Sequence, residues 1–305
     1  MSRIIIAAAL ALAAVVSAAP VQAQTFRTFV STTGNDNNPC SITEPCRHFQ
    51  AAVDVTPAGG EVDALDPGGY SAVTISQAIT IEGQGWSYIA PPTAGNGITI
   101  TASSGNVVIR GLSINGVGVT GGTNGIVFNS GSSLTVTDCT VQNFVDFGID
   151  LALNSSNPSK FFVSNTRISG NGGDGIYMRS TGSGMMTGVI ERVEIENNTN
   201  VGVDFNPGGA MNVTFSDSVF ADHGIDGIAL YANGPAAKIM VRNSTIANNT
   251  DFGVATGGDT AQIWLTRSTI TGNGTGWQGT VNSYGDNNID GDENADTAPP
   301  LIGYR

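Results

Sequence analysis

The 305-residue chain is poor in positive charge, with 12 Lys plus Arg against 25 Asp plus Glu and a formal net charge of -13. Nucleic acids and anionic membranes attract proteins through basic patches, which this composition cannot supply. Both are therefore disfavoured as partners, whereas Ca²⁺ or a neutral sugar suits an acidic chain.

Long apolar segments are also scarce. The one marked run, Ile4 to Val16, is too short to span a bilayer. It follows a single Arg and precedes small residues up to Gln24, a pattern typical of a secretory signal. We therefore predict a signal peptide over 1–23 with cleavage near Ala23, a secreted or periplasmic mature protein, and no membrane span.

Cysteine is rare, with three residues in the chain. Cys40 and Cys46 in "CSITEPC" close a short loop, which predicts a disulfide in an oxidising compartment rather than a metal site, since the nearby sequence does not supply a full set of Cys and His ligands. When the sequence repeats described below are aligned, Cys139 falls at a position that points inward in every repeat. It is therefore interpreted as a buried structural thiol.

Glycine is abundant and recurs with a period. A Gly followed by Ile or Val returns every 23 to 28 residues, at Gly97, Gly125, Gly148, Gly175, Gly202, Gly227 and Gly253. Within each repeat apolar residues alternate with polar ones, which is typical of strands with one buried face. Short strands cannot bury a face alone, but stacked coils share a continuous core. The pattern predicts a solenoid of coils with three short strands each.

The segments "NTRISGNGGDGI", "VEIENNTNVGV" and "STIANNTDFGV" resemble the repeat S-x-I-x-x-N-x-x-x-G-I of right-handed parallel β-helix proteins of the pectate-lyase-like superfold, of the secreted bacterial type. The resemblance implies an all-β right-handed parallel β-helix of about eight coils. We expect the β-helix over 62–281, an N-terminal cap over 24–61 with a short capping helix around Phe49, Ala52 and Val53, and a non-repeat capping tail over 282–305.

Aligned coils explain several conspicuous residues. His223 stands in a column otherwise occupied by Asn171, Asn198, Asn249 and Asn273. Stacked Asn side chains at such turns bond one another and the backbone. His223 is therefore interpreted as a substitute in this ladder rather than as a catalytic base.

The first strand of each coil has an unusually apolar outward column: Val108, Thr135, Phe162, Val189, Thr214, Met240 and Trp264. Aligned exposed apolar side chains mark an oligomer interface, a surface covered by the tail, or an aromatic platform for sugars. We favour a surface covered by the C-terminal tail, or an oligomer contact through Phe162, Met240 and Trp264, over the stacking of sugars on these side chains.

The third strands gather polar residues on one patch. Its members are Asp150, Tyr177, Arg179, Asp204, Asn206 and Tyr231. The resemblance implies that this sheet is the one that carries active sites in pectate lyases and polygalacturonases. Asp150, Tyr177, Arg179 and Asp204 are the catalytic candidates, and Asn206 and Tyr231 are binding candidates. Asp174 in "GGDGI" and Asp226 in "GIDGI" are secondary binding candidates, since turn chemistry alone also explains them.

Three interpretations of this patch stay open. Two coils put Asp150 and Asp204 about 9.6 Å apart, near the wide carboxylate separation of inverting glycosidases. In a lyase, the same two carboxylates would hold Ca²⁺ beside Arg179. In the third interpretation, Arg179 only pairs with the two carboxylates on an exposed sheet. The Asp-Asp, Gly-His-Gly and Arg-Ile-Lys motifs of polygalacturonases are absent, and basic surface is thin because Lys160 and Lys238 are the only lysines.

The segment "DNNIDGDEN" places Asp286, Asn288 and Asp290 at alternate positions before Gly291. This matches the first half of a Ca²⁺ loop, but Thr297 stands where the bidentate Glu is needed. A solvated capping loop is the default interpretation. The sequence as a whole predicts a secreted β-helix that binds an extracellular polysaccharide, with cleavage by a lyase or hydrolase mechanism left open. The alternative is a structural or adhesive surface protein without catalysis.

Overall fold

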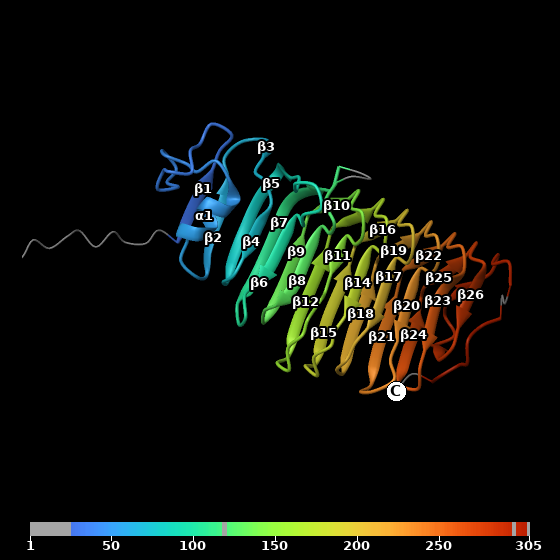
Figure 1. Ribbon diagram of the computed structural model, residues 1–305. Coiled ribbons are helices and arrows are strands. Elements are labelled where there is room, and N and C mark those ends of the chain that lie inside the picture. The colour runs from blue at the N-terminus through green and yellow to red at the C-terminus, as the bar shows by residue number, and fades with distance from the viewer. Residues whose placement is uncertain (1–25, 118–120, 295–296, 304–305) are drawn as a thin grey trace, which may run out of the picture.

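The computed structural model describes residues 26–117, 121–294 and 297–303, so the predicted signal peptide lies outside the described residues. Coils of parallel strands are stacked along one axis in about eight turns (Figure 1). Each strand pairs with the equivalent strand of the next coil, as β12 (Ser159–Ser164) does with β15 (Met186–Glu191). The strands form one 19-stranded and one nine-stranded sheet.

Three series of strands run up the solenoid. The first comprises β1 (Arg27–Val30), β2 (Gly60–Ala64), β5 (Ile79–Ile89), β7 (Asn106–Asn115), β9 (Ser133–Thr137), β12, β15, β18 (Met211–Ser216), β21 (Ala237–Arg242), β24 (Ala261–Thr266) and β27 (Val281–Ser283). The second comprises β3 (Gly68–Gly69), β10 (Thr140–Gln142), β13 (Arg167–Ser169), β16 (Glu194–Glu196), β19 (Val219–Ala221), β22 (Thr245–Ala247), β25 (Thr269–Thr271) and β28 (Asn288–Ile289).

The third series is the nine-stranded sheet. It comprises β4 (Val73–Ile75), β6 (Ile98–Thr101), β8 (Ile126–Ser130), β11 (Ile149–Asp150), β14 (Ile176–Arg179), β17 (Val203–Asn206), β20 (Ile228–Tyr231), β23 (Phe252–Gly257) and β26 (Thr275–Gln278).

A single residue in the left-handed region makes the bend between the first and second strands of a coil. Asn165 has φ 46°, and the equivalent Asp217 and Asn243 have φ 54° and 46°. Asn and Asp adopt this conformation more readily than most residues. The requirement for this conformation at the bend explains why Asn and Asp recur there in register with the strands.

The recurring glycines are required by the closeness of neighbouring coils. A Cβ placed on Gly175 would lie 2.6 Å from the carbonyl oxygen of Gly202, and one on Gly202 would lie 2.5 Å from that of Gly227. No side chain fits at that distance. The glycine period read from the sequence therefore gives the number of residues per coil, because each coil needs one Gly where it approaches the next coil closely.

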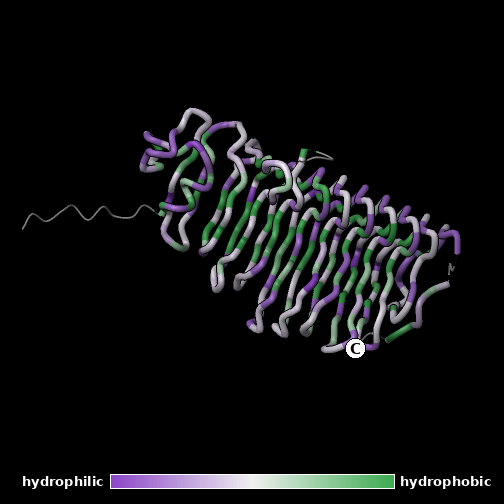
Figure 2. Tube along the Cα trace, in the orientation of Figure 1, coloured by the Kyte–Doolittle hydropathy of each residue, from purple (hydrophilic) through white to green (hydrophobic). Residues whose placement is uncertain are grey.

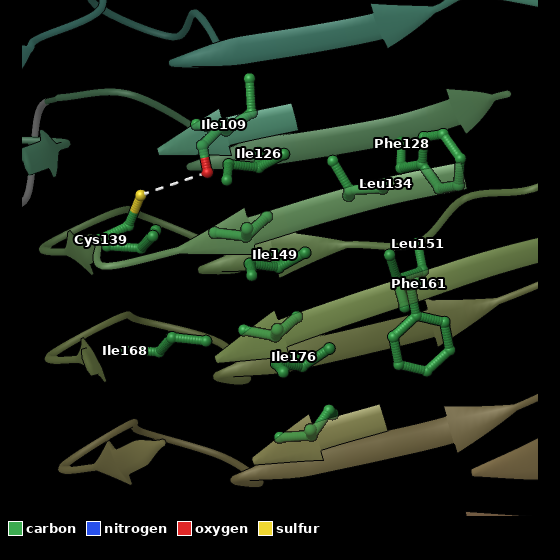
Figure 3. Packing of buried hydrophobic residues seen from close by; sticks show 14 of the residues in the cluster. Ile109, Ile126, Phe128, Leu134, Cys139, Ile149, Leu151, Phe161, Ile168 and Ile176 are labelled. Atoms are coloured by element: carbon green, nitrogen blue, oxygen red, sulfur yellow. Dashed lines mark hydrogen bonds between the residues drawn. The ribbon is translucent and has the colours of Figure 1, made fainter. Parts of the chain in front are cut away.

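The inward side chains of the three series form one continuous core, seen as hydrophobic rows in Figure 2. Figure 3 shows Phe161 of β12 beside Leu151, with the Ile side chains of successive coils stacked further along the strands. The Phe161 ring meets Phe205 of β17 edge to face at 6.1 Å, so the first and third series pack against each other. Gly188 is in register with the apolar residues Phe161 and Val213 of the neighbouring coils. It lies against the Phe161 ring, because a Cβ on Gly188 would be 2.2 Å from Cζ of that ring.

The Asn column forms the predicted ladder. Asn171 Nδ2 donates to Asn198 Oδ1 at 2.8 Å, and Asn249 Nδ2 donates to Asn273 Oδ1 at 2.8 Å. His223 sits between these pairs, where its Nδ1 accepts the backbone N–H of Asn198 at 3.3 Å. Nε2 of His223 and Nδ2 of Asn198 are buried without a hydrogen-bond partner among the described residues. His223 is thus a ladder substitute that leaves two donors unsatisfied.

Small polar side chains make a second ladder. Ser218 Oγ donates to the carbonyl of Ser216 at 2.7 Å and accepts the N–H of Val193 at 3.3 Å, and Ser244 repeats the pattern one coil later. Cys139 occupies this column with 4 % exposure, and its Sγ lies 3.1 Å from the carbonyl oxygen of Thr137. Burial raises the pKa of the Cys139 thiol to about 12. The predicted buried structural thiol is confirmed.

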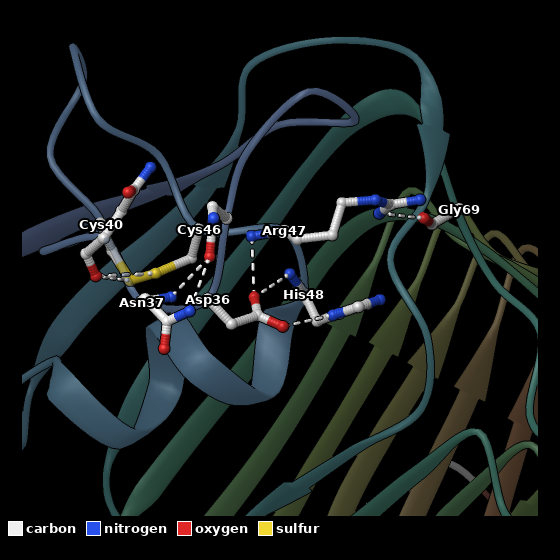
Figure 4. Close-up of polar contacts among 9 residues, drawn as sticks. Asp36, Asn37, Cys40, Cys46, Arg47, His48 and Gly69 are labelled. Atoms are coloured by element: carbon white, nitrogen blue, oxygen red, sulfur yellow. Dashed lines mark hydrogen bonds and ion pairs between the residues drawn. A yellow bond between two sulfur atoms is a disulfide. The ribbon is translucent and has the colours of Figure 1, made fainter.

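The N-terminal segment contains the predicted disulfide and helix. Cys40 and Cys46 are bonded, beside the Asp36 carboxylate that accepts the backbone N–H groups of Arg47 and His48 (Figure 4). The helix α1 (Phe49–Val55) buries Phe49, Ala52 and Val53. These three residues are the ones expected to cover the first coil.

Parallel pairing continues into both terminal segments. β1 pairs with β2 at one end, and β28 pairs with β25 at the other. The tail then continues over the last coil in the same direction, with parallel bridges from Thr275 to Asn294 and from Ser283 to Leu301. Ile302 N–H donates to the carbonyl of Ser283 at 2.9 Å, and Trp277 Nε1 donates to that of Thr297 at 2.6 Å. The domain boundaries at 61 and 281 stay predictions. In the described part of the chain, no helix has the length and apolar character needed to cross a membrane.

Candidate functional site

Four strands of the third series bring the predicted site residues together. Asp150 of β11 is in register with Tyr177 of β14, which is in register with Asp204 of β17. Arg179 is likewise opposite Asn206, one step further along the same strands. We call this surface the carboxylate face; with Tyr231 of β20 it comprises the six residues expected from the sequence.

Tyr177 is held rigidly at the middle of the carboxylate face. Its ring stacks on Phe147 with the centroids 4.3 Å apart and the planes inclined by 20°, and the Arg179 guanidinium carbon lies 5.8 Å from the centre of the Tyr177 ring. Stacked rings and a cation over an aromatic face are both stabilising. Sequence reasoning missed Phe147, although an aromatic residue directly before Gly148 was a visible signal.

The surroundings of Asp204 disfavour the charged form of its carboxyl group. Its Oδ1 is buried and has no hydrogen-bond partner in the described part of the chain. Burial, and after it the negative charges of Asp174 and Asp226, raises the pKa of Asp204 from 3.8 to about 7. Burial also raises the pKa of Asp150, while the nearby Arg179 opposes that rise. The face therefore pairs a carboxyl that is protonated near neutral pH with one closer to a cation.

Asp174 and Asp226 have a structural role in the turns. They are 5 % and 3 % exposed, and their Oδ1 atoms accept the backbone N–H groups of Val201 and Phe252, each at 3.0 Å. Burial raises the pKa of Asp174 to about 6. These carboxylates cap the next coil and act on Asp204 through their charge. Direct contact with a ligand stays a prediction for both.

The two binding candidates lie at the rim of the face. Asn206 is exposed, and Tyr231 is 43 % exposed with its ring against Gly257. The connections that follow the four strands are short, over 151–158, 180–185, 207–210 and 232–236. The carboxylate face is therefore a shallow surface with a half-buried floor rather than a deep cleft.

The residues of the candidate calcium loop, Asp286, Asn288 and Asp290, make contacts within the protein. Asp286 accepts hydrogen bonds from Thr266 Oγ1 at 2.8 Å and the N–H of Arg267 at 3.1 Å, while Asp290 accepts the N–H of Gly291. Asn288 belongs to β28, the last rung of the second series. Over 26–117, 121–294 and 297–303, no group of three or more His, Cys, Asp or Glu side chains is arranged to hold a metal ion. Calcium binding at Asp286, Asn288 and Asp290 stays a prediction without a gathered ligand set.

The apolar outward column lies on the opposite outer surface, on the first series. Phe162, Met240 and Trp264 are half-buried there, and Val189 is 36 % exposed. The tail reaches this column near Trp264, where Tyr284 lines the same depression. An oligomer contact through this column stays a prediction.

The chain belongs to the family described as a right-handed β-helix region, whose model matches residues 66–179 and 153–240. Among solved structures it is similar to a pectate lyase, Pel9A, with a TM-score of 0.61 and 14% identity over 87% of this chain and 78% of that one. It is also similar to the enzymatically active domain of tailspike protein 2 of bacteriophage CBA120, with a TM-score of 0.59 and 13% identity over 77% of this chain and 39% of that one. No curated protein matches the sequence.

These findings confirm the all-β right-handed parallel β-helix predicted from the repeat. At such low identities the two similar structures show the fold alone. The function must be argued from the site.

Proposed function

We propose that this protein binds an extracellular polysaccharide along the carboxylate face. The observation that carries the proposal is the Tyr177 platform, a ring fixed by Phe147 beneath it and Arg179 beside it, with a carboxyl group in register on either side. The apolar side of a sugar ring packs on such an aromatic, while carboxylates and Arg bond its hydroxyl groups.

The shallow topography fits a polymer. A small molecule needs an enclosing pocket to bury most of its surface. A chain of sugars gains affinity by repeating modest contacts over several coils, from Asp150 on β11 to Tyr231 on β20. Pectate lyase Pel9A and the tailspike domain supply precedent for enzymes on this fold, and the predicted signal peptide would deliver the protein outside the cytoplasm.

The pKa of Asp204 favours hydrolysis as the chemistry if the bound glycan is cleaved. A carboxyl with a pKa of about 7 is still about half protonated at neutral pH and suits the general acid, while Asp150 would be the general base. Their separation of about 9.6 Å, two strand spacings, leaves room for a water, as in inverting glycosidases.

Incubation of the protein with a panel of neutral and uronate polysaccharides tests the proposal. Binding is measured by affinity electrophoresis, and cleavage by reducing ends and by the ultraviolet absorbance of unsaturated products, with and without EDTA. We expect retention by at least one glycan for which Tyr177→Ala and Arg179→Ala weaken the retention, and reducing ends that disappear in Asp204→Asn. Retention of no glycan would contradict the proposal.

The rival function is a structural or adhesive role in which the solenoid is a rigid spacer. The short connections around the carboxylate face are the observation that favours it. The panel separates the two functions, because a spacer gives the same result for the wild type and for Tyr177→Ala on every glycan.

A further inference from the structure

The only two lysines of the chain lie on the same outer surface. Lys160 of β12 and Lys238 of β21 both point outward from the first series and are exposed. They occupy the same column, because the register runs from Lys160 through Thr187 and Asn212 to Lys238. Three strand spacings separate them by about 14 Å. We call the surface formed by Lys160, Phe162, Val189, Asn212, Lys238 and Trp264 the lysine face.

A shallow groove connects the two lysines. One depression of about 400 Å³ is lined by Lys160, Phe162 and Asn212, and a second of about 360 Å³ is lined by Asn212, Lys238 and Trp264. The shared Asn212 joins them into one groove.

Each end of the groove combines a cation with an aromatic ring. Lys160 is two residues before Phe162 on the same face of β12, and Lys238 Nζ lies 5.7 Å from the centre of the Trp264 ring. Asn212 supplies an exposed amide between the two ends. Rings that pack on sugars, an amide for hydroxyl groups and two ammonium groups for anions are the groups that an acidic oligosaccharide requires.

The charge of this face is opposite to that of the molecule. The net charge is -13, yet Glu191 is the one acidic residue at the described outward positions from β9 to β24, and it is paired with Arg192. The ion pairs of the described residues include neither lysine, whereas Arg27, Arg110, Arg167 and Arg192 are all paired with carboxylates. The lysines therefore keep their charge available for an external anion.

We propose that the lysine face is a second glycan site, which binds an oligosaccharide carrying carboxylate groups in the groove from Lys160 to Trp264. This site is separate from the carboxylate face and does not depend on it. An anionic chain would approach a surface whose one outward carboxylate from β9 to β24, Glu191, is already paired, and the negative charge elsewhere on the molecule would favour this approach.

Calorimetric titration of the full chain with a hexuronate oligosaccharide tests the site, with an uncharged oligosaccharide of equal length for comparison. We expect the double variant Lys160→Gln/Lys238→Gln to bind the acidic ligand about tenfold more weakly or worse. Its affinity should also depend less on salt, because the charge contribution that salt screens has been removed.

Arg242→Gln is the matched control, since Arg242 is an exposed cation on the same strand as Lys238 but lines neither depression. It should change the affinity less than twofold. Tyr177→Ala and Arg179→Ala should leave this binding intact, so the failure of this site and of the carboxylate face are distinguishable.

Three results would overturn the proposal: no binding of the acidic oligosaccharide, equal loss in Arg242→Gln and the lysine variant, or equal affinity in the wild type and the lysine variant. Sedimentation velocity covers the remaining alternative. A dimer that dissociates in Trp264→Ala would assign the face to a second copy of the chain instead. Trp264 is only half-buried on the outer surface, so this variant should remain folded.

Discussion

The carboxylate face and the lysine face are built from the same coils and share one core, but they differ in charge and in their response to pH. The third series presents half-buried carboxyl groups whose pKa values are raised by burial. The first series presents exposed lysines and aromatic side chains over a groove. Because inward positions are fixed by packing, only outward positions are free to differ between the faces.

Raised carboxyl pKa values are found on the carboxylate face and in the turns beside it. Asp204 and Asp174 have raised pKa values of about 7 and about 6, and the neighbouring His223 has a pKa lowered by burial to about 4. These groups act in opposite directions on stability. The raised carboxyl pKa values favour the folded state at low pH, and the lowered His223 pKa favours it at higher pH.

The largest expected effect comes from the core that the two faces share. Phe205 is fully buried and contacts both Phe161 and Phe215 across the coil. Phe205→Ala should lower the free energy of unfolding by about 3–5 kcal/mol through lost burial and a residual cavity. Guanidinium unfolding measures this, with the outer-surface variant Val189→Ala as a control expected within about 1 kcal/mol of wild type. Equal losses in both would contradict a core common to the faces.

Asp204→Asn should stabilise the protein at high pH. The folded pKa of about 7 exceeds the unfolded 3.8, so the stabilising contribution of Asp204 is complete below 3.8 and lost as pH rises through 7. Asp204→Asn has no group that ionises there, so its free energy of unfolding at pH 8 should exceed that of the wild type by up to about 3 kcal/mol. Urea unfolding at several pH values measures the gain. The exposed Asp259→Asn should show no such trend, and a gain that is independent of pH would count against the assigned cause.

His223→Asn should repair the ladder. It supplies an Oδ1 acceptor for Asn198 Nδ2, which is now unsatisfied, and should gain about 1 kcal/mol at pH 7.5. The gain should grow at pH 5, since the lowered pKa of His223 makes its contribution fall as pH drops from 6.5 towards about 4. Thermal unfolding at both pH values measures it. Asn171→His makes the reverse change and should destabilise; stabilisation by both would refute the ladder account.

The smallest effect is expected for Cys139→Ser. Serine already occupies this column at Ser218 and Ser244, where the hydroxyl group donates to the carbonyl two residues before. The variant should stay within about 1 kcal/mol of wild type. Chemical unfolding and a thiol-reactivity assay test it, and rapid modification of Cys139 in the native wild type would contradict the observed burial.

The sequence predicted the architecture well because stacking repeats the same requirement in every coil. Gly175 and Asn171 stand in columns, and a column is visible in a single sequence. The carboxylate face was also predictable, since period-two alternation assigns Asp150 and Tyr177 outward. Contacts between different columns were not predictable: the Phe147 ring on Tyr177 and the effect of Asp174 on Asp204 depend on how the turn folds over the sheet.

The groove of the lysine face was likewise hidden in the sequence. The apolar column through Phe162 and Trp264 was recognised, but Lys160 and Lys238 are 78 positions apart in the chain (238 minus 160). Their common column was implicit in the aligned coils, because Lys160 stands two residues before Phe162 and Lys238 two residues before Met240. The depressions between the lysines are visible only in the structure.

The most direct test of the central claim is a titration of the polysaccharide retained by the wild type into Tyr177→Ala, with Val219→Ala as the control on the second series. Val219 is a partly exposed apolar residue of β19 in the second series, which carries neither face. The account predicts that Tyr177→Ala loses about tenfold in affinity while Val219→Ala retains it. Equal affinities in the wild type and Tyr177→Ala would contradict the assignment of polysaccharide binding to the carboxylate face.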